Sequence, residues 1–192
     1  MEMERKIAVI DVDSIAYKIF HPKKVLDKNN IPLRSENKFV YKEKNEQEIL
    51  YSCNFVMDEI LTNCNCTHYI GYIKGFNTTS FRKSINNSYK SNRSLDEPKW
   101  WSYTKDMLIH EWNIIEANDH EVDDIVNITR LNLKDSFLVG IDKDLLNLES
   151  INPHYNWKDN KWISTTKSEA NYHFWCDMIC GQPGDGLSGL KG

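Results

Sequence analysis

Acidic residues stand in pairs directly after two apolar runs of the sequence. Asp11 and Asp13 follow the run IAVI, and Asp142 and Asp144 follow the run FLVGI. Carboxylates two residues apart on extended backbone point to the same side, where they repel one another unless a cation lies between them. Because Mg²⁺ and Mn²⁺ prefer carboxylate oxygens, the two pairs indicate a site for divalent cations.

A third acidic group, EVDD, contains Glu121, Asp123 and Asp124. Glu121 and Asp124 share a face if this stretch is helical, and acids are favourable where a helix begins. The plain alternative is therefore a helix start that carries no further role. Glu116 with Asp119 offers a second register. We prefer Glu121, because apolar residues continue its helix.

The three acidic groups together favour metal binding over separate structural roles. For each group alone, a strand-end turn or a helix start explains the charges equally well. Gathered at one edge of a sheet, however, they would repel strongly in a partly dehydrated cleft. One or two divalent ions would compensate them. Such ions suit phosphodiester cleavage, because one helps to generate hydroxide while the other stabilises the leaving oxygen.

A segment without acids, residues 75–95, complements these groups. Its basic residues are Arg82, Lys83, Lys90 and Arg93. If the segment is helical, Arg82, Tyr89 and Arg93 fall roughly on one face. Lys and Arg pair with phosphates and an aromatic ring can stack on a nucleobase, so these four bases and Tyr89 are candidate nucleic-acid contacts. The alternative is a solvated basic loop, but next to a metal site the segment favours a nuclease.

Apolar patterning predicts the elements that position these residues. Strands are expected at 7–10, 67–73, 112–117 and 137–141, helices at 48–64, 121–133 and 168–180, and a hairpin at 154–164. Asp96 is expected to cap a further helix with Pro98 in its first turn, and 21–47 to be a loop or irregular hairpin. The alternation predicts an α/β fold with a mainly parallel central sheet flanked by helices, whose ligands bind beyond the carboxyl ends of the strands.

Composition sets outer limits on the protein. Its 192 residues fit one domain, and a hydrophobic content of 40% is enough for a core. No apolar run is long enough to span a membrane, and the N-terminal apolar stretch is too short for a secretory signal. Five cysteines without zinc spacing predict reduced thiols in a cytoplasmic protein, with Cys176 and Cys180 in the core. The net charge of −4 alone argues against nucleic-acid binding, but the separation of the charges matters more.

The ordered motifs resemble the 5′–3′ exonuclease and flap endonuclease family, most closely its phage-encoded members. They are IDVD, FRKSINNSYKSNR, EVDD, IDKDL and the glycine-rich end GQPGDGLSGLKG. The similarity runs from about Ile7 to the last residue. The resemblance implies a PIN-like 5′-nuclease fold: a catalytic domain over 1–180, a helical arch at about 76–96, and, over 181–192, the start of a helix–turn–helix element that grips duplex DNA.

The resemblance also implies a chemistry. It implies a metal-dependent, structure-specific 5′-nuclease that acts on DNA with 5′ ends or flaps, or on RNA–DNA hybrids, and leaves 5′-phosphates, in phage replication or DNA degradation within the host cytoplasm. Lys90 would match the catalytic lysine and Arg93 a phosphate-binding arginine. The implied metal ligands are Asp11, Glu121, Asp123, Asp124 and Asp142, with Asp144 and Asp185 on the side of a second ion. The ions would be one or two Mg²⁺ or Mn²⁺, with K⁺ at the glycine-rich end.

The sequence departs from the family pattern in three places. Lys74 stands where members usually have an acid after the second strand, and Gln182 replaces an aspartate in the terminal motif. Both changes remove negative charge near a metal, and Gln182 should lower affinity for the second ion most. The duplex-binding element has only begun by Gly192, so a further segment or a second chain would supply the rest.

Two other functions stay open. The first is a nucleic-acid-binding relative in which the missing acids have weakened catalysis. The second is a compact ribonuclease of the PIN-domain kind, against which the basic segment and the glycine-rich end both count.

Overall fold

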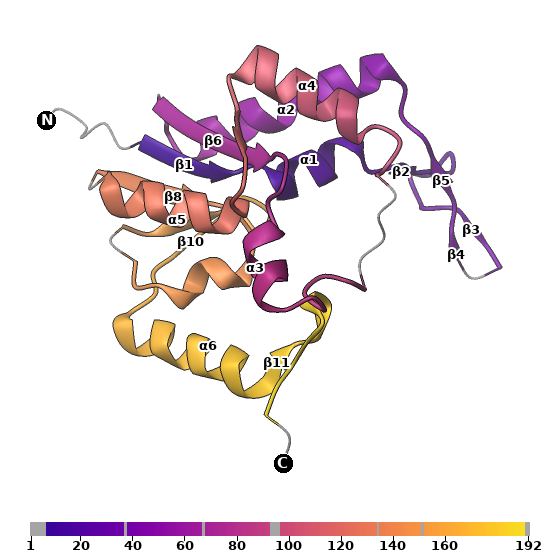
Figure 1. Cartoon of the computed structure of the whole chain (residues 1–192). Coiled ribbons are helices and arrows are strands. Elements are labelled where there is room, and N and C mark those ends of the chain that lie inside the picture. The colour runs from indigo at the N-terminus through magenta and orange to yellow at the C-terminus, as the bar shows by residue number, and fades with distance from the viewer. Residues whose placement is uncertain are drawn as a thin grey trace, which may run out of the picture.

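A six-stranded sheet forms the centre of the computed structural model, with helices on both of its faces (Figure 1). The structure describes residues 7–36, 38–66, 68–92, 97–133, 135–150 and 152–190. The strands are β1 (Ile7–Asp11), β6 (His68–Lys74), β7 (Ile115–Ala117), β8 (Ser136–Val139), β9 (His154–Asn156) and β10 (Lys161–Ile163). Their order is β10-β9-β8-β1-β6-β7, and only β10 runs antiparallel to its neighbour. The predicted α/β fold with a mainly parallel sheet is confirmed.

Alternating side chains of β1 fill two separate cores. Ala8 and Ile10 face helices α1 (Asp13–Phe20), α2 (Glu46–Asn63) and α4 (Trp101–Trp112), whereas Val9 faces α5 (Val122–Asn132). Period-two alternation places successive residues on opposite faces, so a strand buried on both sides must be apolar throughout. The unbroken run IAVI is therefore what fixes β1 at the middle of the sheet, with Asp11 at its carboxyl end.

Local signals set most helix ends within two residues of their predicted positions. Helix α2 begins with a reciprocal capping box, in which the side chains of Asn45 and Glu48 each accept from the other's backbone amide. The further helix predicted after Pro98 is present as α4, but the placement of Pro98 in its first turn was wrong: the helix begins at Trp101, and Pro98 precedes it in a turn closed by the Trp101 amide. Asp96, the predicted cap, lies outside the described residues.

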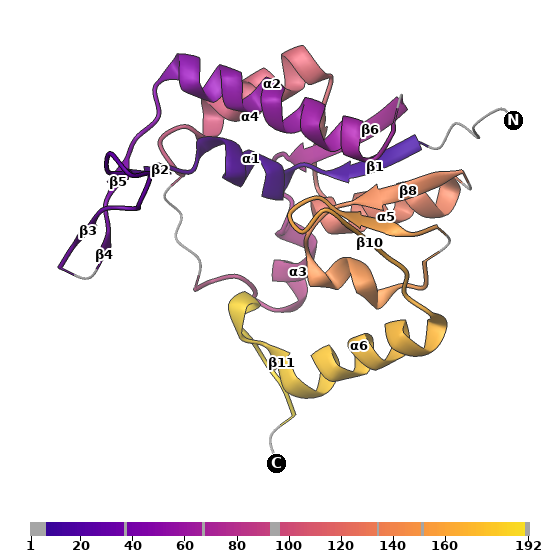
Figure 2. The same ribbon diagram turned by 180° about the vertical axis from the view of Figure 1, so that it is seen from behind.

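Residues 22–43 project from the body as a pair of short hairpins. Strand β2 (Lys23–Lys24) pairs with β5 (Tyr41–Lys42), and β3 (Arg34–Ser35) pairs with β4 (Lys38–Phe39). The view from behind shows these hairpins extending beyond α1, away from the sheet (Figure 2). The irregular hairpin predicted for this stretch is confirmed.

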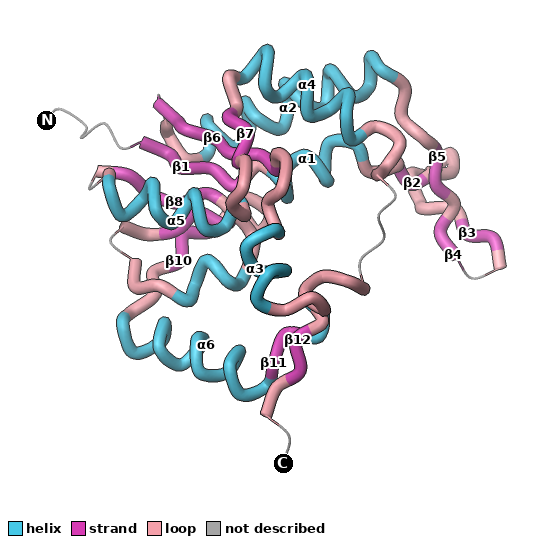
Figure 3. The backbone as a smooth tube through the Cα atoms, in the orientation of Figure 1, coloured by secondary structure: helices cyan, strands magenta, loops and turns pink. Residues whose placement is uncertain are grey.

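The last part of the chain lies apart from the sheet (Figure 3). Helix α6 (Lys167–Cys180) leads into β11 (Gly181–Gln182), the 3-10 turn η2 (Pro183–Asp185) and β12 (Leu187–Ser188). Only Ala170 of α6 is buried. Its exposed apolar side chains are Tyr172, Phe174, Trp175, Met178 and Ile179.

The core positions predicted for Cys176 and Cys180 were wrong. Cys176 is partly exposed and Cys180 is exposed. No layer of the described structure covers this side of α6, which is why an apolar helical face did not mean burial. Separately, no helix in the described ranges is long and apolar enough to cross a membrane.

Candidate active site

Two of the predicted acidic groups meet at the carboxyl edge of the sheet. Asp11 is the last residue of β1, and Asp142 follows the neighbouring parallel strand β8, whose Val139 pairs with Ile10. Asp11 is only 4% exposed. Burial raises the pKa of Asp11 well above its ordinary value, and the nearby charges of Asp13, Asp123 and Asp142 raise it further. Carboxyl groups more than 100 residues apart in the sequence thus lie close enough to repel.

The third group joins them through the start of α5. Asp123 lies in the first turn of that helix. Burial, and then the charge of Asp142, raise the pKa of Asp123 to about 7. A carboxyl group with such a pKa is partly protonated at neutral pH and is poised to exchange its proton for a metal ion.

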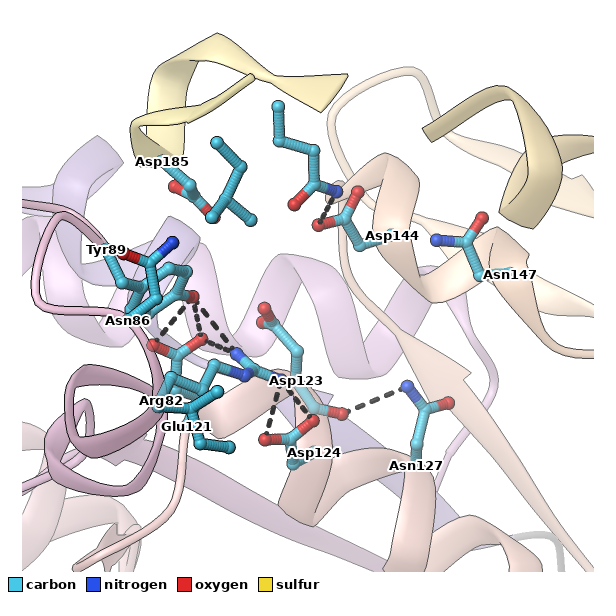
Figure 4. Close-up of a pocket in the computed structure, with 13 residues that line it drawn as sticks. Arg82, Asn86, Tyr89, Glu121, Asp123, Asp124, Asn127, Asp144, Asn147 and Asp185 are labelled. Atoms are coloured by element: carbon cyan, nitrogen blue, oxygen red, sulfur yellow. Dashed lines mark hydrogen bonds and ion pairs between the residues drawn. The ribbon is translucent and has the colours of Figure 1, made fainter. Parts of the chain in front are cut away.

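A cleft of about 400 Å³ opens beside these acids (Figure 4). Asp123, Asp144 and Asp185 reach it from α5, from the 3-10 helix η1 (Lys143–Asn147) and from η2. Burial and the charge of Asp142 raise the pKa of Asp144. Its Oδ2 accepts a hydrogen bond from Gln182 Nε2 at 3.3 Å, whereas its Oδ1 is buried with no donor among the described residues. The cleft therefore holds an acceptor oxygen that a cation or a water would satisfy.

Glu121, at the base of the cleft, is bound by three donors from the basic segment. Lys90 Nζ donates to its Oε1 at 2.9 Å, and the Tyr89 hydroxyl lies 2.9 Å from its Oε2. Arg82 Nη1 donates to the same carboxylate, while Arg82 Nη2 donates to both oxygens of Asp124, at 2.8 and 2.9 Å. Glu121 is 6% exposed, so these contacts provide the charge compensation that its burial requires.

These contacts keep Lys90 protonated. Burial alone would lower the pKa of Lys90, but hydrogen bonds to Glu121 and Tyr89 outweigh that effect and raise the pKa above its ordinary value. Lys90 can therefore hold negative charge, as a phosphate-binding group must, but it cannot serve as a general base at neutral pH.

The basic segment is only partly helical. Helix α3 (Ser80–Ile85) ends at Asn86, and Tyr89 and Lys90 lie in the turns that follow. The predicted shared helical face is therefore not formed, yet Arg82 Nη1 still reaches the Tyr89 hydroxyl at 3.1 Å. Lys83 is exposed and does not line the cleft, and Arg93 lies outside the described residues.

The glycine-rich end packs against this segment. The Lys90 amide donates to the Asp185 carbonyl at 2.7 Å, and Asn92 Nδ2 donates to the Pro183 carbonyl. Gly186 has a left-handed backbone, and a Cβ there would lie 2.7 Å from the Ser88 carbonyl oxygen. Only glycine allows both the turn and this close approach.

The residues of the two acidic registers lie in different surroundings. Glu121 lies in the cleft, whereas Glu116 pairs with Lys105. Lys74 ends β6, and its backbone amide donates to Asp13 Oδ1 at 2.7 Å. Burial raises the pKa of Asp13 and the positive charge of Lys74 opposes that rise, so this cation lies near the acidic cluster.

Sequence reasoning did not identify Asn127 and Asn147. Both line the cleft, and each has a buried Oδ1 with no donor among the described residues. The only signal was the position of Asn127, one helical turn after Asp123.

The side chains that line the cleft have the chemistry that a hard divalent cation requires. Most of their possible ligand atoms are carboxylate oxygens, and Asp144 Oδ1 is a buried acceptor without a donor among the described residues. Within the described ranges, however, no three His, Cys, Asp or Glu side chains converge on one point that could hold a metal. Mg²⁺ keeps several waters and needs only one or two carboxylates, so this spacing remains compatible with it.

The fold is that of 5′-nucleases. Among solved structures, bacteriophage T5 5′-exonuclease with bound divalent zinc ions matches with a TM-score of 0.66 and 14% identity, over 98% of this chain and 71% of that one. A variant T5 flap endonuclease in complex with DNA and metal ions matches with a TM-score of 0.64 and 13% identity, over 98% and 71%. A T5 5′-exonuclease mutant matches with a TM-score of 0.62 and 12% identity, over 98% and 67%. No protein-family model matches the chain, and no curated protein matches it.

Glu121→Gln should destabilise the protein. The change leaves Lys90 and Arg82 with a weaker acceptor, and we expect the free energy of unfolding to fall by about 2 kcal/mol. Denaturant unfolding at low salt measures this. Glu116→Gln is the matched control, since it breaks a more exposed ion pair of the same type. Equal effects of the two changes would contradict the role given to Glu121.

Stability without metal should fall as pH rises from about 4 to about 7. A carboxyl group whose pKa is raised on folding stabilises the folded state while it is protonated, and this stabilisation is lost as pH passes the folded-state value. For Asp123 the loss is up to about 4 kcal/mol. Thermal melting of chelator-treated protein at acidic and alkaline pH measures it.

Asp123→Asn is the control for that pH dependence. The substitution should reduce the loss of stability between about pH 4 and about pH 7. The buried His154 affects the pH dependence of stability equally in the variant and the unmodified protein. Mg²⁺ or Mn²⁺ should raise the melting temperature of the unmodified protein more at alkaline than at acidic pH. A pH dependence that the substitution leaves unchanged would remove Asp123 from the acidic cluster.

Proposed function

We propose that this protein is a metal-dependent 5′-nuclease that hydrolyses phosphodiester bonds in DNA. The observation that carries the proposal is the meeting of carboxylates from β1, α5 and η1 at one edge of the sheet, opposite cations of the basic segment. The same fold occurs in a T5 flap endonuclease solved with DNA and metal ions, which supports a nucleic-acid substrate.

The protein's own residues divide the work. One divalent ion would lie among Asp11, Asp123 and Asp142, bound directly by one or two of these carboxylates and through its waters by the rest, and Asp144 with Asp185 would hold a second. Bound divalent ions supply Lewis-acid chemistry to the phosphate that is cleaved. Lys90 would move from Glu121 to the substrate phosphate and neutralise charge that builds up there.

The remaining contacts would position the basic segment. Arg82 stays on Asp124 and fixes this segment over the cleft, while Tyr89 supports Lys90, whose Nζ lies 5.0 Å from the centre of the Tyr89 ring. Tyr89 is only 4% exposed and its hydroxyl is bound to Glu121, so the predicted stacking of its ring on a nucleobase is not supported. Lys83 and Arg93 would bind phosphates outside the cleft. In this proposal residues 76–96 form the arch over the 5′ strand, and residues 181–192 begin the element that binds duplex DNA, with K⁺.

A nucleic-acid-binding relative without efficient catalysis is the second candidate. It is favoured by Glu121 and Asp124, whose oxygens are already taken by Arg82, Tyr89 and Lys90. In that protein the cations of the basic segment would compensate the acids permanently, and added metal would change little.

Cleavage of end-labelled substrates separates the two candidates. With Mg²⁺ or Mn²⁺, flapped and nicked DNA should be cut to products with 5′-phosphates, and Asp142→Asn should slow cutting on the order of 100- to 1,000-fold while DNA binding persists. Asp106→Asn, on the exposed side of α4, is the matched control. No cutting of any substrate would favour the second candidate, and a preference for single-stranded RNA would favour a PIN-type ribonuclease.

Gln182→Asp should strengthen binding of the second ion. The change replaces the amide that now donates to Asp144 with a carboxylate, which adds a ligand and removes a competing donor. We expect the half-saturating Mn²⁺ concentration for cleavage to fall by about 10-fold or more. Gln182→Asn keeps an amide and serves as the control. If both variants require the same Mn²⁺ concentration as the unmodified protein, Gln182 lies outside the metal site.

A further inference from the structure

The paired hairpins of residues 22–43, here called the hairpin arm, have almost no packing of their own. None of the described residues in this range is buried, and the arm meets the body mainly next to α1. Just after it, the buried Lys44 donates to the Ile19 carbonyl and anchors the returning strand to that helix. Because the arm has no core, packing does not explain which residues it contains.

Positive charge dominates the hairpin arm. Its basic residues are Lys23, Lys24, Lys28, Arg34, Lys38 and Lys42, and all are exposed. Against these stand three acids, Asp27, Glu36 and Glu43. The net charge of the arm is therefore +3, in a chain whose total is −4. Such a concentration of positive charge attracts a polyanion.

The arm's own acids and neighbours do little to neutralise these cations. The side chain of Asp27 is engaged within the turn, where its Oδ1 accepts hydrogen bonds from the backbone amides of Asn29 and Ile31. Lys23 reaches Glu48 of α2 at 3.2 Å. For the other five cations of the arm, the described residues form no ion pair.

Strand pairing brings like charges together. Lys23 lies directly opposite Lys42 in the β2–β5 pair, an arrangement that destabilises a two-stranded ribbon. A phosphate between or beside the two ammonium groups would relieve this repulsion. In the described structure Glu48 pairs with Lys23 and offsets part of this repulsion, while Lys42 forms no ion pair.

Two cations of the arm lie over the ring of Phe39. Lys24 Nζ lies 4.2 Å from the centre of the Phe39 ring, and Arg34 Cζ lies 4.5 Å from it. Cation–π contacts hold the charged ends over the ring instead of leaving them fully mobile. The arm thus presents a partly ordered pair of cations, which lowers the entropy lost when they bind phosphates.

The hairpin arm lies on the side of the molecule toward which β1 runs, and Asp11 is the last residue of that strand. Strand β1 runs toward α1, and the arm projects beyond α1 in the same direction (Figures 1 and 2). A duplex that leaves the cleft on this side would meet the arm.

We propose that the hairpin arm is a second DNA-binding surface, which grips the phosphate backbone of duplex DNA outside the cleft. The inference rests on the proposed function for its substrate, but it needs no catalysis. Binding through Lys and Arg to phosphates should be independent of sequence and strongly dependent on salt.

Fluorescence anisotropy with a labelled duplex, in chelator and without cleavage, tests the arm. The variant Lys24→Glu/Lys38→Glu should weaken binding by about 10-fold or more near physiological salt, and should reduce the slope of log K against log salt by about two. The control Lys161→Glu/Lys167→Glu alters the net charge equally, at exposed positions on β10 and at the start of α6, outside the arm. Both proteins should keep the melting temperature of the unmodified chain, since none of these side chains is buried.

Each result bears on the proposal separately from the nuclease activity. Equal binding by the arm variant and the control would overturn the proposal, even if the protein cuts DNA. Loss of binding in the arm variant would support it, even if no substrate is cut. If the arm variant instead lost only affinity for anionic lipid vesicles, the surface would belong to a membrane and the proposal would be wrong. If the charge reversal unfolds the protein, Lys24→Gln/Lys38→Gln keeps the same comparison.

Discussion

The site depends on how buried carboxylates obtain positive charge. At Glu121 the protein supplies that charge itself, through Arg82 and Lys90, and Tyr89 adds a hydrogen bond. These contacts tie the basic segment to the start of α5. At Asp11 and Asp123 no such contact balances the charge. Burial and the neighbouring carboxylates therefore make the ionised forms unfavourable, which raises the pKa values of both groups. The cluster is therefore divided into a compensated half and an uncompensated half. Only the second half has a free-energy reason to take up a cation.

The fold supplies this division through strand order. Because β1 and β8 are adjacent and parallel, Asp11 and Asp142 must leave the sheet at the same edge. Helix α5 packs on the face of the sheet filled by Val9 and Leu138, and its first turn delivers Glu121 and Asp123 to that edge. The glycine-rich end closes the other side of the cleft through its contact with the Lys90 backbone.

The sheet and the acids at its edge could be predicted from the sequence, because buried strands appear as apolar runs and helix starts carry characteristic residues. Sequence patterns did not give the partners of Glu121, because Arg82 lies 39 residues away and no periodicity links the two. They also misjudged α6: spacing showed an apolar face but could not show what covers it. The same limit applied to the basic segment, where Asn86 ends α3 before Tyr89 and Lys90.

Helix α6 has a consequence for the dynamics of the cleft. It contacts η1 through Asp177, which accepts from Asn147 at 3.1 Å, and otherwise buries little besides Ala170. Segments with so few buried contacts open locally at a small fraction of the global unfolding free energy. Amide hydrogens of α6 should thus exchange early, and each opening would release η1 and with it Asp144.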